Sequence, residues 1–333
     1  MKLKLNRNLA FWLLFLVTVV DAQKAKICDL SCSDLLAVTE KSDRETFLEV
    51  ARNCPPVVTD KITDHDYESM YGDLLIPYLR DSNLKKKGGV KFLEIGLGCD
   101  MVYGPGSSSS IWKQFLSCPG DELWMGEFNK TCVDDSRRKG QLDGIKTVVG
   151  DQGDPATLKQ WLEVTGGIRS NFDIIIDDGG HQQHQIFESL LALWPALKPG
   201  GLYFIEDLQV SRWAFYNTRS AENYEPIIDH IKQWIENKLE GNPEYLQNWH
   251  SKTRQHHHSM PAAKSRKISR PILSSENMTS MLHRQSEYSM PTSVAHIDVY
   301  HESVVLRKCA IGEKGCDNPR LPQHPQMVMQ PPH

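Results

Sequence analysis

The sequence predicts an α/β protein built on a doubly wound, mostly parallel Rossmann-like sheet with a terminal antiparallel hairpin. Short apolar runs alternate with segments of helical spacing from residue 90 to residue 208, which is the pattern of successive βαβ units. The runs are continuously apolar, as expected of parallel strands buried on both faces. Several end in glycine or an acid, and open α/β sheets bind ligands at the carboxyl ends of their strands.

The stretch from 172 to 208 is the clearest of these units. One apolar run, 172–176, ends in Asp-Asp-Gly-Gly-His at 177–181, and a second, 202–205, ends in Glu206 and Asp207. The segment between them has helical spacing and stops at Lys-Pro-Gly-Gly, the residue types that end helices. Both acidic ends therefore lie at one edge of the sheet, where carboxylates and a histidine would suit a hard cation and an acid/base group.

Three further strands are expected upstream, over 90–95, 122–126 and 145–149. They end in Glu94-Ile95-Gly96-Leu97-Gly98, in Glu127 and in Gly150-Asp151-Gln152. Glycines after a strand let the backbone approach a ligand, although a plain strand-to-helix turn would use them equally well. The third glycine of the dinucleotide fingerprint is replaced by Met101, which disfavours a Rossmann-type oxidoreductase. An acid after the second strand can accept both ribose hydroxyls of a nucleoside.

The segment 209–292 separates these strands from an expected antiparallel hairpin, 296–300 and 303–307. Its first part, 212–216, is aromatic and basic, and 227–239 has helical spacing. Residues 251–271 carry many basic side chains and no acid. We favour a disordered, solvated loop there over a mobile lid that attracts an anionic substrate.

The first 22 residues have the layout of a secretory signal peptide: basic residues, an apolar run over 9–20 and small residues after it. The run is shorter than the roughly 20 residues that a membrane span needs, so we favour cleavage over retention as an anchor. We therefore expect no stable membrane span in the mature chain. The expected location is the secretory pathway, either secreted or in the lumen of the endoplasmic reticulum or Golgi.

The rest of the chain divides into a helical lead-in over 23–85, a main domain over 86–310 that contains the 209–292 insertion, and a disordered tail over 311–333. The formal net charge of −4 gives no support to a nucleic-acid partner. The chain has 8 cysteines, all after the signal, which suggests disulfides; for Cys99 a simple buried thiol is an equal alternative. Of the two glycosylation sequons, at Asn129 and Asn277, only Asn277 is expected to be clearly exposed.

As a set, these motifs resemble class I S-adenosylmethionine-dependent methyltransferases, most closely the metal-dependent macrocin/mycinamicin O-methyltransferase and cephalosporin-hydroxylase type. The resemblance covers about residues 59–210 and 293–308. It rests on the glycine loop at 94–98, the turn at 150–154, the turn at 175–181 and the strand at 197–208. The Thr59-Asp60-Lys61 and Tyr67…Tyr71 pattern is also similar, whereas Gly180 stands where the family usually has serine.

The resemblance implies an S-adenosylmethionine-dependent, divalent-metal-assisted O-methyltransferase that acts on a hydroxyl of a sugar or small natural product. Asp178, Glu206 and Asp207 would bind Mg²⁺ or Mn²⁺, whose preferred ligands are hard oxygens. His181 would be the general base. The cofactor would be bound by a further set of residues, which comprises Glu94, Gly96, Gly98, Glu127, Asp151, Gln152 and Asp177. The acceptor would be a small molecule or a glycan.

Structural alternatives accompany these roles. Asp178 or Asp207 could cap a helix, and His181 could be a satisfied polar residue at a helix start. Asp177 should face away from Asp178 because successive strand residues point to opposite faces. At the level of the whole protein, the alternative function is a non-catalytic secreted binding protein on a methyltransferase scaffold.

Overall fold

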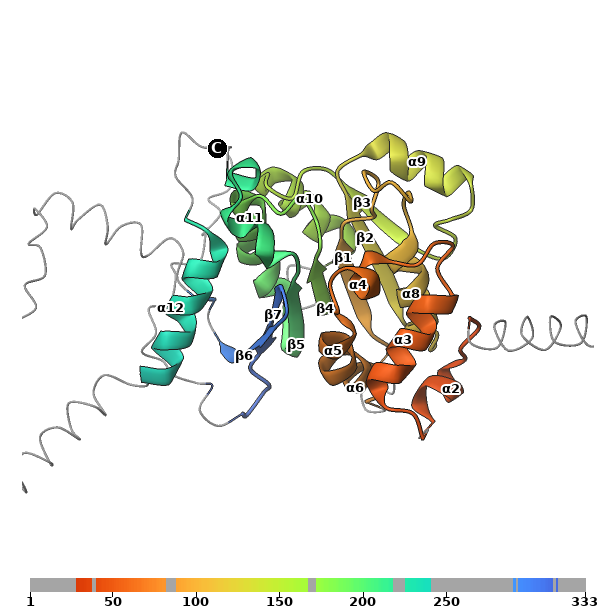
Figure 1. Ribbon diagram of the computed structural model, residues 1–333, viewed down its shortest axis with the longest axis horizontal. Coiled ribbons are helices and arrows are strands. Elements are labelled where there is room, and N and C mark those ends of the chain that lie inside the picture. The colour runs from red at the N-terminus through yellow and green to blue at the C-terminus, as the bar shows by residue number, and fades with distance from the viewer. Residues whose placement is uncertain are drawn as a thin grey trace, which may run out of the picture.

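The computed structural model describes residues 28–37, 40–81, 88–166, 172–217, 225–240, 290–291, 293–313 and 316. Within these residues, one seven-stranded sheet has the order β3-β2-β1-β4-β5-β7-β6 (Figure 1). Its strands are β1 (Lys91–Ile95), β2 (Glu122–Glu127), β3 (Lys146–Val149), β4 (Phe172–Asp177), β5 (Leu197–Ile205), β6 (Val294–Tyr300) and β7 (Ser303–Lys308). The first five strands are parallel, and β7 pairs antiparallel with both β5 and β6. The predicted doubly wound sheet with a terminal hairpin is confirmed.

Helices cover both faces of the sheet, and each face has its own apolar core. One core joins the sheet to the lead-in helices and to the helices that follow β1 and β2. The helices on this side are α2 (Cys32–Leu36), α3 (Asp43–Asn53), α4 (Asp60–Thr63), α5 (Glu68–Met70), the π-helical turn Tyr71–Leu75, α6 (Ile76–Leu79), α8 (Ser107–Phe115) and α9 (Lys130–Arg138). The other core joins it to α10 (Pro155–Thr165), α11 (Gln183–Leu193), a 3₁₀ turn at Trp194–Ala196 and α12 (Ile227–Glu240).

The lead-in is part of the same core as the sheet. Tyr67, Met70, Tyr71 and Leu75 are almost fully buried, and the Tyr71 ring lies 5.6 Å from the ring of Phe204 in β5. The helical spacing expected over this segment is therefore confirmed, with one π-helical turn in its middle. This packing holds α4 and α5 over the carboxyl ends of β4 and β5 (Figure 1).

All cysteines are paired, which extends the sequence prediction. The disulfides are Cys28–Cys54, Cys32–Cys118, Cys99–Cys132 and Cys309–Cys316. The alternative of a simple buried thiol at Cys99 is therefore wrong. The expectation about the sequons also needs a correction, because Asn129 is exposed at the start of α9.

Several predictions concern residues outside those that the structure describes. These are the signal peptide, the basic stretch 251–271, the sequon at Asn277 and most of the C-terminal tail. Within the described part of the chain, no helix is long and apolar enough to cross a membrane.

Candidate active site

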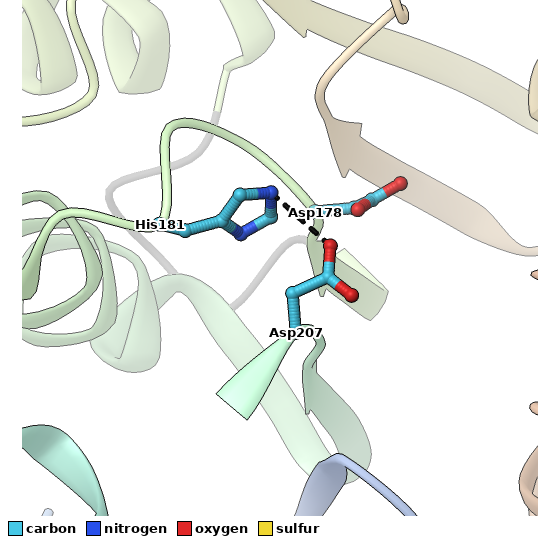
Figure 2. Close-up of side chains that lie close together, drawn as sticks. All are labelled: Asp178, His181 and Asp207. Carbon is cyan, nitrogen blue, oxygen red and sulfur yellow. Dashed lines mark ion pairs between the residues drawn. The ribbon is translucent and has the colours of Figure 1, made fainter. Parts of the chain in front are cut away.

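Three side chains that could hold a metal ion converge at the carboxyl ends of β4 and β5. Asp178 directly follows β4, Asp207 follows β5, and His181 lies in the turn between β4 and α11. One ligand atom from each lies within 4.8 Å of the others, and His181 Nε2 is 3.2 Å from Asp207 Oδ2 (Figure 2). Two carboxylates and an imidazole are thus gathered where open α/β sheets bind ligands.

The backbone at this edge adopts unusual conformations. His181 has φ = 54°, Asp207 has φ = 55° and Glu302, in the turn between β6 and β7, has φ = 56°. Left-handed φ values are uncommon for residues other than glycine and are tolerated where the surrounding structure fixes them. Tyr67 fixes the conformation of Asp207 with two hydrogen bonds. Its Oη donates to Asp207 Oδ1 (2.9 Å) and accepts from the backbone N–H of Asp207 (2.9 Å).

The structure bears differently on the structural alternatives for Asp207 and His181: Asp207 makes no capping hydrogen bond, whereas His181 is a polar residue next to a helix start that is paired with Asp207. Asp207 precedes a 3₁₀ turn, Leu208–Arg212, but its side chain makes no capping hydrogen bond. His181 lies before α11, whose N-cap is Gln182. Asp207 Oδ1 instead accepts from the side-chain amide of Gln209 in that turn (3.2 Å), and the His181 ring faces Asp207 rather than α11.

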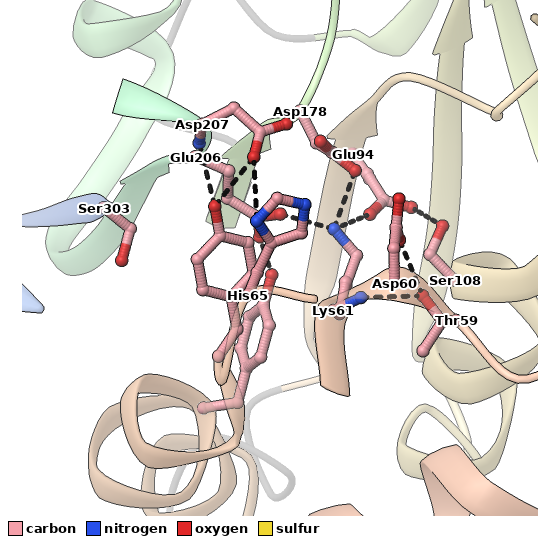
Figure 3. A network of polar contacts seen from close by, with 12 residues as sticks. Thr59, Asp60, Lys61, His65, Glu94, Ser108, Asp178, Glu206, Asp207 and Ser303 are labelled. Atoms are coloured by element: carbon pink, nitrogen blue, oxygen red, sulfur yellow. Dashed lines mark hydrogen bonds and ion pairs between the residues drawn. The ribbon is translucent and has the colours of Figure 1, made fainter. Parts of the chain in front are cut away.

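Glu206 lies in a different environment from the group it was expected to join. It is almost fully buried and accepts hydrogen bonds from Lys61 Nζ (2.5 Å) and from the hydroxyl of Tyr71. Lys61 Nζ also donates to Asp178 Oδ2 (2.7 Å) and lies 3.4 Å from Glu94 Oε1 (Figure 3). One buried ammonium group from α4 thus faces three carboxylates, from the ends of β1, β4 and β5.

The charges at this edge shift one another's protonation. Burial alone would lower the pKa of Lys61, but Asp178, Glu206 and Glu94 raise it well above its ordinary value. Burial raises the pKa of Glu94 and of Glu206 to about 7, against the opposing effect of Lys61. Burial alone would raise the pKa of Asp207, but the neighbouring His181 and His65 bring it below its ordinary value.

The residues expected to bind a cofactor lie along the adjacent ends of β1 and β2. Gly96 and Gly98 have φ values of 106° and 78°, which glycine adopts at little cost. Glu127 ends β2, where its Oε2 accepts from the N–H of Leu97 (3.1 Å) and its Oε1 from the N–H of Asn129 (2.8 Å). The carboxylate therefore joins the glycine loop to the start of α9 and keeps acceptor capacity for further donors.

Three other expected cofactor residues are hydrogen bonded to the turn that carries His181 or to α11, which follows it. Gln152 donates to Asp177 Oδ1 (2.8 Å) and accepts from the N–H of Gly180 (3.1 Å). Asp177 is buried and also accepts from Ser189 of α11, so it faces away from Asp178, as alternation along the strand predicts. Asp151 accepts from Gly153 and Gln185. Glu94, also fully buried, accepts from Ser108 of α8 (2.6 Å).

Sequence reasoning missed the contribution of the lead-in to this edge. Lys61 forms the centre of the carboxylate cluster, and His65 Nδ1 lies 2.8 Å from Glu302 Oε2 and 3.6 Å from Asp207 Oδ1. The one signal in the sequence is the family-like Thr59-Asp60-Lys61 and Tyr67…Tyr71 pattern, which by itself assigns no role to these residues.

Comparison with known proteins finds similar sequences among O-methyltransferases. The sequence matches no protein-family model. Over 180 residues it is 31% identical to the 8-demethyl-8-alpha-L-rhamnosyl tetracenomycin-C 2'-O-methyltransferase of Streptomyces olivaceus, a match that covers 54% of this chain and 42% of that protein. Over 125 residues it is 38% identical to the demethylmacrocin O-methyltransferase of Streptomyces fradiae, covering 37% and 29%. These relatives confirm the resemblance drawn from the motifs.

The matches are partial in length. The chain spans less than half the length of these two curated relatives. Among solved structures, the MycE methyltransferase of the mycinamycin biosynthetic pathway, in complex with Mg and SAH, is 22% identical with a TM-score of 0.49, covering 83% of this chain and 56% of that one.

Proposed function

We propose that this protein transfers a methyl group from S-adenosylmethionine to a hydroxyl of a sugar or small natural product, assisted by Mg²⁺ or Mn²⁺. The observation that carries the proposal is the convergence of Asp178, His181 and Asp207 at the strand edge next to the glycine loop. The names of the curated relatives support it, since both are O-methyltransferases and one is named for a rhamnosyl compound.

The donor set fits a hard divalent cation. Asp178 and Asp207 offer carboxylate oxygens within 4.8 Å of each other and of a His181 ring nitrogen, and such oxygens are the ligands that Mg²⁺ and Mn²⁺ prefer. Glu206, the third proposed ligand, would have to exchange its contact with Lys61 for one with the ion. A bound ion of this kind lowers the pKa of a hydroxyl that it holds.

His181 is the proposed general base, since a neutral imidazole can accept the acceptor's proton near neutral pH. Its Nε2 faces Asp207 at 3.2 Å, so the carboxylate can orient the ring and stabilise the imidazolium that forms. The methyl group of S-adenosylmethionine is already activated, so the main task of the chain is to hold acceptor and donor in line.

The cofactor would lie along the ends of β1 and β2. Gly96 and Gly98 give the loop after β1 its left-handed turns, which would present its backbone to the cofactor, and the Glu127 carboxylate would accept hydrogen bonds from the ribose hydroxyls. Gln152 would support this site through its hydrogen bonds with Asp177 and Gly180, and Asp151 through its hydrogen bond with Gln185 of α11.

We further propose that the protein works in the secretory pathway. Four disulfides with no free cysteine support an oxidising compartment. Asn129 is exposed and belongs to a sequon, so it could carry a glycan there.

The function is tested by following radiolabelled methyl transfer from S-adenosylmethionine to a panel of methyl glycosides, with Mg²⁺ and with EDTA. We expect transfer that requires the metal and falls by about 10²–10⁴-fold in His181→Asn. Lys159→Met, on the exposed side of α10, is the control. Binding of acceptors without transfer would favour the non-catalytic binding protein instead.

A further inference from the structure

We propose that Trp213, Phe215 and Tyr216 form an aromatic platform that binds the acceptor as a neutral glycoside, beside His181. This inference rests on the proposed function and names the part of the acceptor that the protein recognises. The three rings belong to the ten residues that directly follow Asp207, so they are built onto the same strand end as the candidate metal group.

The segment 208–213, which leads from β5 to the three rings, is held in place by hydrogen bonds and an ion pair. The N–H of Leu208 donates to the carbonyl of Glu302 (2.7 Å), and the N–H of Trp213 donates to the carbonyl of Val210 (2.8 Å). Val210 and Ser211 are buried. Arg212 forms an ion pair with Asp229 of α12 (2.5 Å). The segment is therefore anchored to the β6–β7 turn and to α12.

The rings are exposed although the segment beneath them is anchored. Trp213 is 59% exposed and Phe215 is 71% exposed. Large aromatic side chains contribute their stabilisation by leaving water, so a cluster of them on a fixed surface marks a site that binds something apolar on at least one face.

Tyr216 connects the exposed rings to the proposed base. Its ring centre lies 6.1 Å from that of His181, in an edge-to-face arrangement. It lies 5.1 Å from the ring of Phe215 and 6.4 Å from that of Trp213. An acceptor held on these rings would therefore extend directly to His181 and the two carboxylates.

The chemistry of the surface favours a neutral sugar. Arg212 is the one charged residue between 208 and 217, and it is engaged with Asp229. A pyranose ring has an apolar face of C–H groups, which packs on aromatic rings, and a rim of hydroxyls, which remain available to polar groups. The sugar that reacts would present a hydroxyl to His181, and a second ring of a longer glycoside would lie on Trp213 and Phe215.

The test uses the full chain and measures binding of methyl α-L-rhamnoside, methyl β-D-glucoside, methyl β-maltoside and methyl β-D-glucuronide by saturation-transfer NMR. We expect the neutral glycosides to bind, the maltoside more tightly than the glucoside. Trp213→Ala and Phe215→Ala should each weaken maltoside binding at least tenfold, whereas Trp213→Phe should largely retain it. The control is Val164→Ala, at an equally exposed apolar position (57%) near the end of α10.

Calorimetry with S-adenosylhomocysteine on the same proteins separates this inference from the proposed function. If the wild type does not bind S-adenosylhomocysteine, the proposed function fails, and the glycoside titrations still decide on the platform. Glycoside binding that is unchanged in Trp213→Ala and Phe215→Ala, binding of the glucuronide alone, or no binding of any glycoside would each overturn the platform.

Discussion

The Nζ atom of Lys61 lies 2.7 Å from Oδ2 of Asp178, so a buried cation of the lead-in neutralises a proposed metal ligand of the sheet. The same nitrogen lies 2.5 Å from Glu206 Oε2, and Lys61 is only 2% exposed. Carboxylates at the end of a buried sheet repel one another unless a positive charge lies among them. Lys61 and a divalent cation would thus both neutralise the negative charge of Asp178 and Glu206.

Replacing Lys61 by methionine should therefore destabilise the protein and make its stability depend on metal. Loss of one partner of a buried ion pair costs about 3–5 kcal/mol. We expect Mg²⁺ to restore part of the melting temperature of Lys61→Met, because the ion would take over the neutralisation of Asp178 and Glu206. Thermal unfolding with Mg²⁺ and with EDTA measures this, with Lys159→Met, from an exposed ion pair on α10, as the control. A Lys61→Met protein as stable as the wild type would show that the ion pairs contribute nothing to folding.

Gly96 should tolerate substitution less well than Gly104, although both have left-handed backbones. The φ angles are 106° and 83°, so alanine at either position carries a backbone strain of about 1–2 kcal/mol. A Cβ atom at Gly96 would also collide with the backbone carbonyl of Asp178, whereas one at Gly104 would meet nothing within 4 Å. Gly96→Ala should therefore bind the cofactor several-fold more weakly than Gly104→Ala, as measured by calorimetry. It should also have the lower melting temperature in thermal unfolding. Equal effects would argue against the close contact between the glycine loop and Asp178.

Glu127→Ala should weaken binding of S-adenosylmethionine by about 1–3 kcal/mol, the range for lost hydrogen bonds to a charged acceptor. Part of this loss would be indirect, because Glu127 also accepts from Leu97 and Asn129 and so holds the loop itself. Glu127→Gln keeps the size of the side chain and one carbonyl acceptor, so it should retain more affinity than Glu127→Ala. Isothermal titration of both variants checks this, and unchanged affinity in Glu127→Ala would remove the residue from the site.

The Cys99–Cys132 disulfide should affect cofactor binding as well as stability. It joins the loop after β1 to α9, on the two sides of the proposed cofactor site. The chain-entropy model gives about 3–4 kcal/mol for its loop and about 2 kcal/mol for the shorter Cys309–Cys316 loop. We expect the double variants Cys99→Ser/Cys132→Ser and Cys309→Ser/Cys316→Ser both to have a lower melting temperature. Only the first should bind S-adenosylhomocysteine more weakly. An equal loss of affinity in the Cys309/Cys316 pair would show that the effect is global.

The sheet could be predicted because each of its strands leaves a local signal. The continuous apolar runs, the glycines after β1 and the acids at the ends of β2, β4 and β5 are all visible in the sequence, and their alternation with helical segments predicts a doubly wound sheet. Alternation along β4 also predicted that Asp177 and Asp178 face opposite sides, as the contacts with Ser189 and Lys61 show.

The contacts across the fold could not be predicted in the same way. Lys61 is 117 residues from Asp178 in the chain. In the sequence it looks like an ordinary solvated lysine, because only the packing of the lead-in brings it to the acidic strand ends. The direction of Glu206 depends on that packing too, because it is Lys61 and Tyr71 that hold it. The pairing of Cys99 with Cys132 likewise depends on how β1 and β2 lie side by side.

The most direct test of metal-assisted methyl transfer at this strand edge is a calorimetric titration of Mg²⁺ into the full chain saturated with S-adenosylhomocysteine. We expect tight cofactor binding and a single metal site, whose heat disappears in Asp207→Asn while S-adenosylhomocysteine still binds. A well-folded protein that binds no S-adenosylhomocysteine, or that binds Mg²⁺ equally well in Asp207→Asn, would contradict this expectation.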